Sequence, residues 1–197
     1  MSRRYVFAGE RLGCSSRQPE TSIRLLIPRT IVSVLVRPLA EVDFDAWWRT
    51  RLRMLKEHPE AFGSSYQEAL AAGPERQRGW FMQPNGFIIG AFDGDALVGT
   101  VGCVQERPAK ERHKAFIWGV YVAPEVRGRG VGRTLMEAAI ARAREWPELQ
   151  QIHLAVAVTN EPARQLYRSL GFQVYGVEPA ALKVDGRDLD EELMLLR

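Results

Sequence analysis

Three glycines and three arginines lie close together within residues 127–133, and such a combination can hold an anion. The glycines are Gly128, Gly130 and Gly132, and the arginines are Arg127, Arg129 and Arg133. Glycine allows a tight turn because it has no Cβ. Apolar residues fall at helical spacing from Val131 onward, so the turn should open a helix. Unpaired N–H groups and the positive end of the helix dipole favour a phosphate there. We therefore predict an anion site, most simply for a pyrophosphate.

Three known phosphate-binding patterns can be compared with this stretch. A P-loop requires a lysine after its last glycine, and Arg133 follows Gly132 instead. A dinucleotide fingerprint requires a third glycine where Arg133 stands and an acidic residue on a later strand, but residues 152–158 lead into Thr159 and Asn160. The third pattern, Arg-x-x-Gly-x-Gly/Ala after a strand, is satisfied by Arg127, Gly130 and Gly132. An ordinary glycine-rich connector is the simpler alternative.

A second stretch, residues 160–172, is typical of a short helix with both ends marked. Asn160 suits the N-cap, Pro162 the first turn and Gly171 a left-handed C-cap. Asn160, Ala163 and Tyr167 are spaced i, i+3 and i+7, so they share one face of that helix. An amphipathic helix alone would explain the apolar residues of this stretch. It would not explain why Asn160 and Tyr167 lie on the same face of that helix.

Together the two stretches resemble the GNAT superfamily of acyl-CoA-dependent N-acyltransferases. Residues 127–132 match its pyrophosphate loop, and residues 160–172 match its motif Asn-x-x-Ala-x-x-Leu-Tyr-x-x-x-Gly-Phe. The resemblance implies acetyl-CoA as acyl donor and places Tyr167 beside the sulfur as general acid, with packing on the sheet as the alternative role. The cofactor-binding residues that it implies are Val120, Tyr121, Val122, Arg127, Gly128, Arg129, Gly130, Val131, Gly132, Arg133, Asn160 and Ala163.

The activity implied by the resemblance is transfer of an acetyl group from acetyl-CoA to a primary amine of a small molecule or a peptide N-terminus. The alternative is a non-catalytic acyl-CoA-binding module, against which an acid near the sulfur argues. The superfamily's acceptor side implicates residues 57–66, Trp118 and residues 185–188. No general base is assigned: Glu57, Glu68, Glu106 and His113 are each explained as solvated charges, and His153 as a packed side chain.

The elements that must position these residues follow from apolar periodicity and turn residues. The order is a strand, helices, three strands in a meander, a helix, a strand, a helix and a final hairpin. The first expected segments are strand 31–36, a helix from about Asp43 to His58, helices after Ser64 and Pro74, and strands 87–92, 96–106 and 116–122. They are followed by a helix from Val131, strand 152–158, a helix from Asn160, strand 172–177, and a final hairpin that turns at 184–187 and ends at Leu196. This order predicts an α/β fold, and by resemblance a GNAT-type three-layer sandwich around a mostly antiparallel mixed sheet of about seven strands.

Glycines inside the central strands suggest local irregularities. In strand 116–122, Phe116, Trp118, Val120 and Val122 alternate with Ile117, Gly119 and Tyr121, which predicts two faces. A bulge at Gly119 could separate this strand from strand 152–158 and open a wedge for the cofactor. Gly99 and Gly102 are further possible bulge sites.

Composition is that of an ordinary soluble globular protein, and 197 residues suit one domain with a full-sized core. No apolar run is long enough for a membrane span. Cys14 and Cys103 provide neither a disulfide framework nor metal-ligand spacing, and Cys103 is expected in the core. We therefore expect a cytoplasmic protein without a bound metal, as a monomer or homodimer.

The formal charge of +3 is concentrated at the N-terminus. Residues 1–30 contain six arginines and two glutamates, a net of +4, so residues 31–197 carry about −1. This division predicts a flexible basic extension over residues 1–30 and an acetyltransferase domain over residues 31–197. The near-neutral domain argues against nucleic acid or a membrane surface as partner.

Overall fold

One mixed β-sheet organises the computed structural model, which describes residues 23–24 and 34–197. Its strand order is β1-β2-β3-β4-β5-β6-β8-β7, and all neighbours are antiparallel except β5 and β6. The strands are β1 (Ile23–Arg24), β2 (Val34–Pro38), β3 (Gly86–Asp93), β4 (Ala96–Gln105), β5 (Lys114–Val122), β6 (Gln151–Ala157), β7 (Gln173–Val184) and β8 (Arg187–Leu196). The seven strands from β2 to β8 are those that the sequence predicts, with β7 longer than expected.

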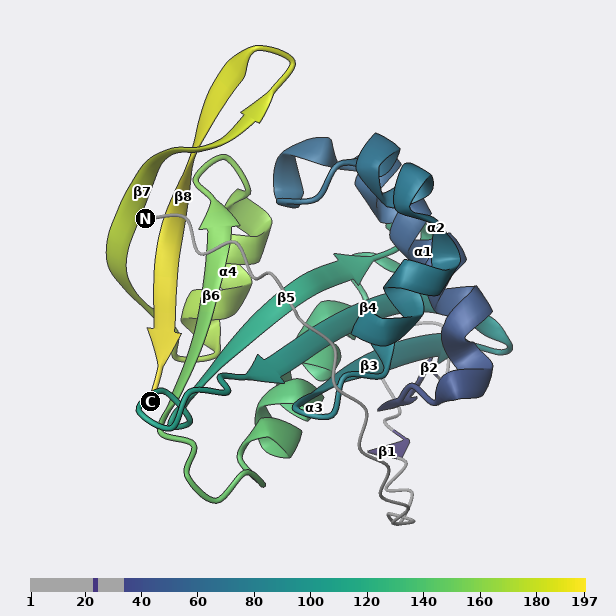
Figure 1. Ribbon diagram of the computed structural model, residues 1–197, viewed down its shortest axis with the longest axis horizontal. Coiled ribbons are helices and arrows are strands. Elements are labelled where there is room, and N and C mark those ends of the chain that lie inside the picture. Colours follow the sequence, from purple (N-terminus) through teal and green to yellow (C-terminus); the bar gives the residue numbers. More distant parts are fainter. Residues whose placement is uncertain (1–22, 25–33) are drawn as a thin grey trace.

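Helices cover both faces of this sheet (Figure 1). Helices α1 (Phe44–Glu57) and α2 (Tyr66–Phe81) lie on one face, while α3 (Val131–Ala143) and α4 (Glu161–Ser169) lie on the other. Short 3-10 turns η1 (Glu41–Asp43), η2 (Pro59–Ala61) and η3 (Pro124–Val126) precede α1, α2 and α3. The predicted three-layer α/β sandwich is therefore confirmed.

The N-terminal predictions fall largely outside the described residues. Residues 1–22 and 25–33 are not described, so the basic extension, Cys14 and the start of the predicted strand 31–36 are not tested. Within that region, Ile23 and Arg24 pair antiparallel with Val36 and Leu35 of β2. Two residues of the predicted extension thus add a short outer strand to the sheet.

The core lies between the sheet and the helices on each side. On α3, Val131, Leu135, Met136 and Ala139 are almost completely buried, which is the helical spacing that their positions predict. Between α1, α2 and β3, a smaller aromatic cluster forms around Phe44, whose ring meets Phe81 edge-on with centroids 5.4 Å apart. Cys103 is fully buried, and burial raises the pKa of its thiol to about 12, so its predicted role as a core residue is confirmed.

The predicted boundaries of α1 and α2 are confirmed with one refinement. Asp43 immediately precedes α1, and the helix ends before His58. The two helices expected after Ser64 and Pro74 run together as α2, broken at Gly73, whose φ is 73°. Ser65 caps the first part by accepting a hydrogen bond from the Glu68 amide.

The alternation expected along β5 is wrong beyond Trp118. Gly102 pairs with Trp118 and Thr100 pairs with Tyr121, so two β5 residues lie opposite Val101 alone. This bulge brings Trp118 and Tyr121 onto the same face, toward α1 and α2. The extra residue of this bulge therefore lies in β5, and Gly102 of β4 is not a bulge residue. Gly102 instead makes room for the Trp118 indole, which a Cβ at Gly102 would approach to 2.3 Å.

A second bulge lies beside Gly99, as the sequence suggests. Ala91 pairs with Gly99 and Phe92 with Leu97, so Val98 is the extra residue on β4.

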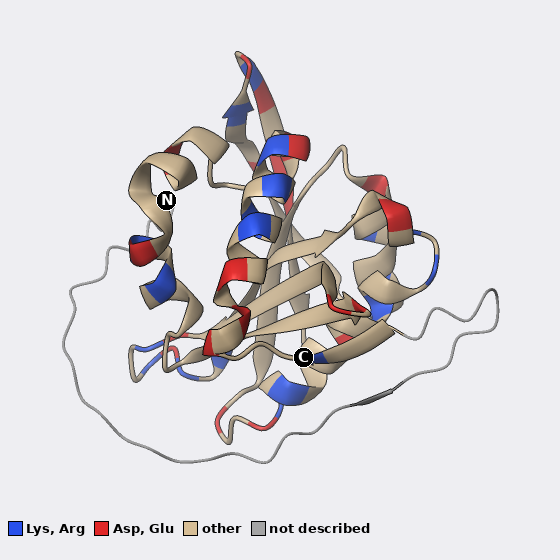
Figure 2. Ribbon diagram, turned by 90° about the vertical axis from the view of Figure 1, so that its right-hand side faces the viewer, with Lys and Arg blue, Asp and Glu red and all other residues tan. Residues whose placement is uncertain are grey.

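On the α1–α2 face, basic and acidic side chains are interspersed (Figure 2). None of the helices in the described part of the chain combines the length and apolar composition needed to span a bilayer.

An ion pair fixes the start of α1 against the sheet, and it makes the stability of the fold depend on pH. Arg37 on β2 contacts both carboxylate oxygens of Asp43 at 2.7 Å, and Asp43 is 7% exposed. These hydrogen bonds lower the pKa of Asp43. A lowered pKa in the folded state stabilises the protein above the unfolded pKa of about 3.9, and this contribution is lost as pH falls through the folded value.

We expect Asp43→Asn to lower the free energy of unfolding by about 1–2 kcal/mol at pH 7, because it removes the charge from a partly buried pair. The deficit should shrink as pH falls through the lowered pKa of folded Asp43, because below it both side chains are neutral. Urea unfolding at several pH values measures it. Asp45→Asn, an exposed change in the first turn of the same helix, is the control. A deficit that is the same at every pH would contradict this role of the charge.

Candidate functional site

The bulge in β5 opens the sheet between its two parallel strands. Gly119 has a φ of 61°, a conformation that other residues rarely adopt. Strands β5 and β6 pair only from Lys114–Gln151 to Phe116–His153, and beyond these pairs they separate. The prediction that a bulge at Gly119 splays the two strands is therefore confirmed. The backbone groups of β5 that face β6 beyond Phe116 are left for another partner.

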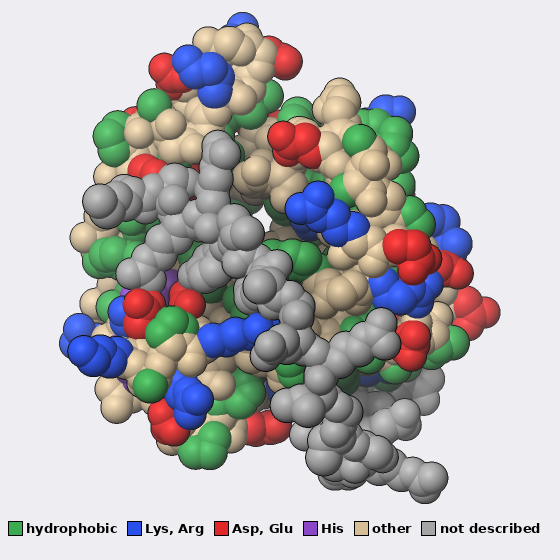
Figure 3. Space-filling view, viewed as in Figure 1, with side chains coloured by type: hydrophobic (Ala, Val, Ile, Leu, Met, Phe, Trp, Pro, Cys, Tyr) green, Lys and Arg blue, Asp and Glu red, His purple; other side chains and the backbone are tan. Residues whose placement is uncertain are grey.

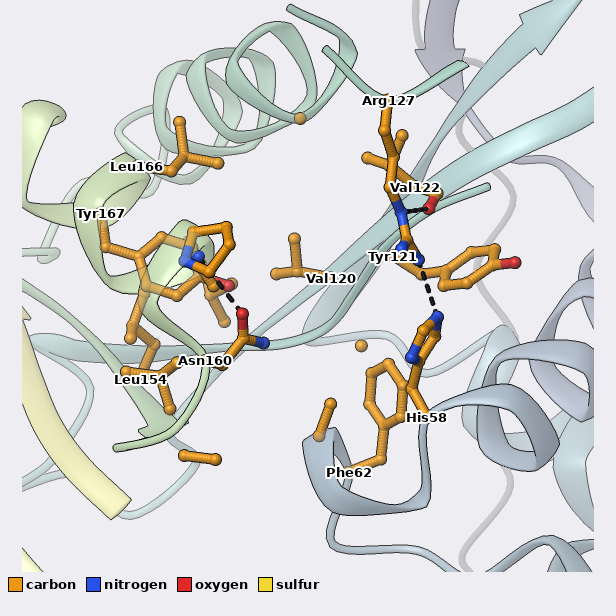
Figure 4. A pocket seen from close by; sticks show the side chains of 18 of the residues that line it. His58, Phe62, Val120, Tyr121, Val122, Arg127, Leu154, Asn160, Leu166 and Tyr167 are labelled. Atoms are coloured by element: carbon orange, nitrogen blue, oxygen red, sulfur yellow. Dashed lines mark hydrogen bonds between the residues drawn. The ribbon is translucent and has the colours of Figure 1, made fainter. Parts of the chain in front are cut away.

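The separated strands form the floor of a cleft of about 810 Å³. Figure 3 shows the surface hollowed between the β7–β8 hairpin and the helices α1 and α2. One wall consists of β6 and α4, the other of His58, Glu60, Ala61 and Phe62 around η2, and the turn before α3 closes one end. In Figure 4, Asn160 and Tyr167 face His58 and Phe62 across the cleft.

The turn before α3 has the geometry of an anion site. Gly130 is the N-cap of α3 and adopts a left-handed conformation with φ of 80°. The first intrahelical bond runs from the Thr134 amide to the Gly130 carbonyl, so the three preceding amides, 131–133, have no partner within the helix. Val131, Gly132 and Arg133 all line the cleft. Three N–H groups and the positive end of the α3 dipole thus meet at its end.

Gly132 and Arg133 hold this turn close to α4. A Cβ at Gly132 would stand 3.4 Å from the Leu166 side chain and 3.5 Å from that of Val122, so α3, α4 and β5 meet there. Arg133 donates to the Ser169 hydroxyl at 2.6 Å. The anion site and the α4 wall therefore form one rigid corner.

Eleven of the twelve predicted cofactor-binding residues line the cleft. They are Val120, Tyr121, Val122, Arg127, Gly128, Gly130, Val131, Gly132, Arg133, Asn160 and Ala163. Arg129 is exposed and is not part of the lining. The side chain of Tyr121 points away toward α1, where its hydroxyl donates to Glu57 Oε2 at 3.0 Å (Figure 4). Whether these residues bind a cofactor stays a prediction.

Helix α4 presents Tyr167 to the cleft. Asn160 caps the helix by accepting a hydrogen bond from the Ala163 amide at 3.3 Å. Tyr167 is 6% exposed, and burial raises the pKa of its hydroxyl, which therefore keeps its proton at neutral pH. Among the described residues this hydroxyl has no hydrogen-bonding partner. Tyr167 lines the cleft, so a ligand there could satisfy the donor of this largely buried side chain.

Ion pairs behind α4 attach the helix to β8. Glu192 is 7% exposed and accepts from Arg164 at 2.5 Å and from Arg168 at 3.0 Å. The hydrogen bond from Arg164 is the main cause of the lowered pKa of the Glu192 carboxyl. This carboxylate therefore stays charged and fixes the orientation of the helix that carries Tyr167.

None of the carboxylates and histidines considered earlier as a base lines the cleft. Glu57 is engaged by Arg53 at 2.8 Å as well as by Tyr121, and the Arg53 contact lowers the pKa of its carboxyl. Glu68, Glu106 and His113 lie elsewhere. His153 is half-buried and packs edge-on against Tyr175, as expected.

Two ionisable residues in the cleft, His58 and Glu60, were not singled out from the sequence. They lie in the stretch 57–66 that the resemblance places on the acceptor side, and that position was their only signal. Trp118 and Phe62 also line the cleft. A smaller cavity of about 320 Å³ adjoins Glu60, between η2 and the β7–β8 hairpin, and Val184, Asp185, Arg187 and Leu189 complete its lining.

Comparison with known sequences agrees with these features. The model of the acetyltransferase (GNAT) family matches residues 47–172. A mycothiol acetyltransferase of Geodermatophilus obscurus is 35% identical over 138 residues, which are 69% of this chain and 43% of that protein. The L-amino acid N-acetyltransferase AaaT of Escherichia coli is 26% identical over 153 residues, 73% of this chain and 85% of that protein. The chain spans about half the length of the mycothiol acetyltransferases that it matches.

Solved structures show the same fold. A GNAT-family acetyltransferase from Streptococcus pneumoniae has a TM-score of 0.75 at 21% identity, over 83% of this chain and 99% of that one. The yncA protein of Salmonella typhimurium, described as a putative acetyltransferase solved with its cofactor acetyl-CoA, has a TM-score of 0.67 at 22% identity, over 84% of this chain and 94% of that one.

The left-handed backbone of Gly119 gives the first prediction for the site. A Cβ at residue 119 would meet only Met54, at 3.8 Å. Gly119→Ala therefore tests the left-handed backbone conformation and not the room for a side chain. We expect the free energy of unfolding to fall by about 1–2 kcal/mol, the usual cost of a left-handed alanine. Gly79→Ala, on an open face of α2, should be neutral or stabilising. Equal effects of the two changes in chemical unfolding would argue against strain at the bulge.

Proposed function

Because the chain belongs to the GNAT acetyltransferase family, we propose that it transfers the acetyl group of acetyl-CoA to a primary amine. This proposal rests on the cleft itself. The cleft brings together the separated backbone of β5, the free amides at the start of α3 and the hydroxyl of Tyr167. Each of these three features matches one part of the cofactor. The acceptor would be a small-molecule amine or a peptide N-terminus.

Acetyl-CoA would lie along the cleft from the α3 turn toward Tyr167. The pyrophosphate would accept hydrogen bonds from the free amides of residues 131–133. The pantetheine arm is an extended chain with two amides, so it can pair with the backbone of Val120 and Val122 where β6 has separated. A β5 amide would then donate to the acetyl carbonyl and stabilise the oxyanion that develops during attack.

Tyr167 would protonate the departing thiolate. The thioester can release sulfur more readily when a proton is delivered, and a positioned acid contributes typically 10²–10⁴-fold. The raised pKa keeps this hydroxyl protonated before the reaction. A module that only bound acyl-CoA would have no use for a buried donor at this place, although the ring also packs against Phe172.

The cavity beside Glu60 supports a small charged acceptor. Its lining combines the carboxylates of Glu60 and Asp185 with the guanidinium of Arg187. A molecule with an amine and a carboxylate could find a partner for each group there. The similar AaaT protein is named for L-amino acids, which have this combination.

Isothermal titration with acetyl-CoA, followed by a screen of amines with release of the free thiol as readout, tests the proposed function. Binding with turnover of at least one amine is expected. Binding without turnover of any amine would indicate a binding module. Absence of acetyl-CoA binding would refute the proposal.

The anion site can be tested by a pair of changes that differ only in charge. Asparagine and aspartate tolerate the left-handed conformation of Gly130 better than other residues with side chains. We expect Gly130→Asp to bind acetyl-CoA roughly tenfold to a thousandfold more weakly than Gly130→Asn, because the carboxylate repels the pyrophosphate. Titration calorimetry measures both. Equal affinities in two folded variants would place the phosphates elsewhere.

Tyr167→Phe separates the chemical role of the hydroxyl from the packing role of the ring. We expect kcat to fall by roughly 10²–10⁴-fold while the Kd for acetyl-CoA changes little, since the acid acts in the transition state. Melting temperature and turnover are measured on the same sample. A lower melting temperature with unchanged turnover would assign Tyr167 to packing alone.

A further inference from the structure

His58 and Arg127 meet on the side of the cleft opposite Tyr167, although they lie 69 positions apart in the sequence (Figure 4). Arg127 Nη2 is 2.7 Å from His58 Nε2, and Arg127 Nε donates to the Val122 carbonyl at 2.9 Å (Figure 4). A guanidinium can only donate hydrogen bonds. His58 Nε2 must therefore accept, so its lone pair is occupied by Arg127 and its proton resides on Nδ1.

Charged side chains lie on both sides of the His58 ring. Nδ1 lies 3.6 Å from Glu60 Oε1, so a carboxylate stands on the side of the ring opposite Arg127. The other charged or titratable groups near the ring are Arg127, Glu57 and Tyr121, whose ring centroid is 6.3 Å away. The Glu57 carboxylate is held by Arg53 and Tyr121, which leaves Glu60 as the acidic partner within the cleft.

Both contacts of Arg127 lie on the route proposed for acetyl-CoA. The Val122 carbonyl belongs to the part of β5 that the pantetheine arm would pair with, and Arg127 itself stands beside the pyrophosphate turn. Arginine binds phosphate through bidentate, charge-assisted hydrogen bonds, which are stronger than a bond to a neutral imidazole. A bound cofactor would therefore draw Arg127 away from Val122 and His58.

We propose that His58 is the general base of the acetyl transfer, and that Arg127 occupies its lone pair until acetyl-CoA binds. This inference rests on the proposed function and adds a general base, a role to which the sequence analysis assigns no residue. Cofactor binding frees Nε2 in the wall opposite Tyr167, next to the cavity in which the amine would lie. His58 and Tyr167, the two groups that transfer protons, then lie on opposite walls of the cleft.

The proton balance is as follows. An ammonium acceptor loses one proton to His58 Nε2, and the freed lone pair attacks the thioester carbon to form the C–N bond. The tetrahedral intermediate carries an oxyanion and a protonated nitrogen. Its C–S bond breaks, the thiolate takes the Tyr167 proton, and the nitrogen returns its extra proton to the tyrosinate. The products are the amide, free CoA thiol and one proton, which His58 releases to water.

His58→Gln is the first test, because glutamine can still accept from Arg127. We expect kcat to fall by roughly 10²–10⁴-fold near neutral pH, with the Kd for acetyl-CoA nearly unchanged. The deficit should narrow as pH rises, since a growing fraction of the amine is already deprotonated. His113→Gln, a histidine outside the cleft, should keep the parent rate and pH profile. A His58→Gln variant with parental kcat near neutral pH would overturn the assignment.

The second test addresses the role of Arg127 without measuring activity. In ¹⁵N-labelled protein, addition of CoA should shift the Nε2 resonance of His58 as the bond from Arg127 is lost. Arg127→Ala should show a similar shift in the free protein, and CoA should then add little. An unchanged resonance in a protein that binds CoA would overturn the gating role. Failure of the parent protein to bind CoA would instead refute the proposed function.

Discussion

The left-handed residue Gly119 is the constraint on which the site depends. An uninterrupted β5 would pair with β6 along its length, and no space would remain between them. The bulge ends this pairing after Phe116 and His153 and turns Trp118 and Tyr121 toward the same helices. It therefore creates the cleft and also anchors one of its walls. Glycine adopts this conformation without steric cost, and the packing of Trp118 over Gly102 and the bond from Tyr121 to Glu57 of α1 hold the bulge in place.

Contacts outside the cleft keep its walls in place. On one side, Glu192 of β8 binds two arginines of α4 and so orients Tyr167. On the other, Arg53 joins Glu57 of α1 to Glu125 of η3, at 2.8 and 2.6 Å. Glu57 in turn holds Tyr121. These pairs link the segment before His58 to the segment before Arg127, which explains why two residues so far apart in sequence face each other.

Local sequence signals predicted the elements and the glycine turn before α3 well. The cap at Asn160, the separate helix expected after Pro74 and the bulge at Gly119 each follow from the chemistry of one or two neighbouring residues. The reversal of faces beyond Trp118 could not be predicted, because it depends on which residue of β4 lies opposite the bulge. The His58–Arg127 contact was missed for a similar reason, since only the folded chain brings η2 to the phosphate turn.

If the cleft transfers an acetyl group as we propose, its distribution of charge explains why a base would be needed near η2. Free amides and Arg133 make the α3 end attractive to an anion, whereas at the hairpin end Glu60 and Asp185 outnumber Arg187 and favour a cation. Those carboxylates would favour an amine in its ammonium form, which has no lone pair for attack. The charge that favours binding of the amine at this end therefore also favours its unreactive, protonated form. In the mechanism that we propose, the imidazole of His58 resolves the conflict by accepting the proton of the ammonium.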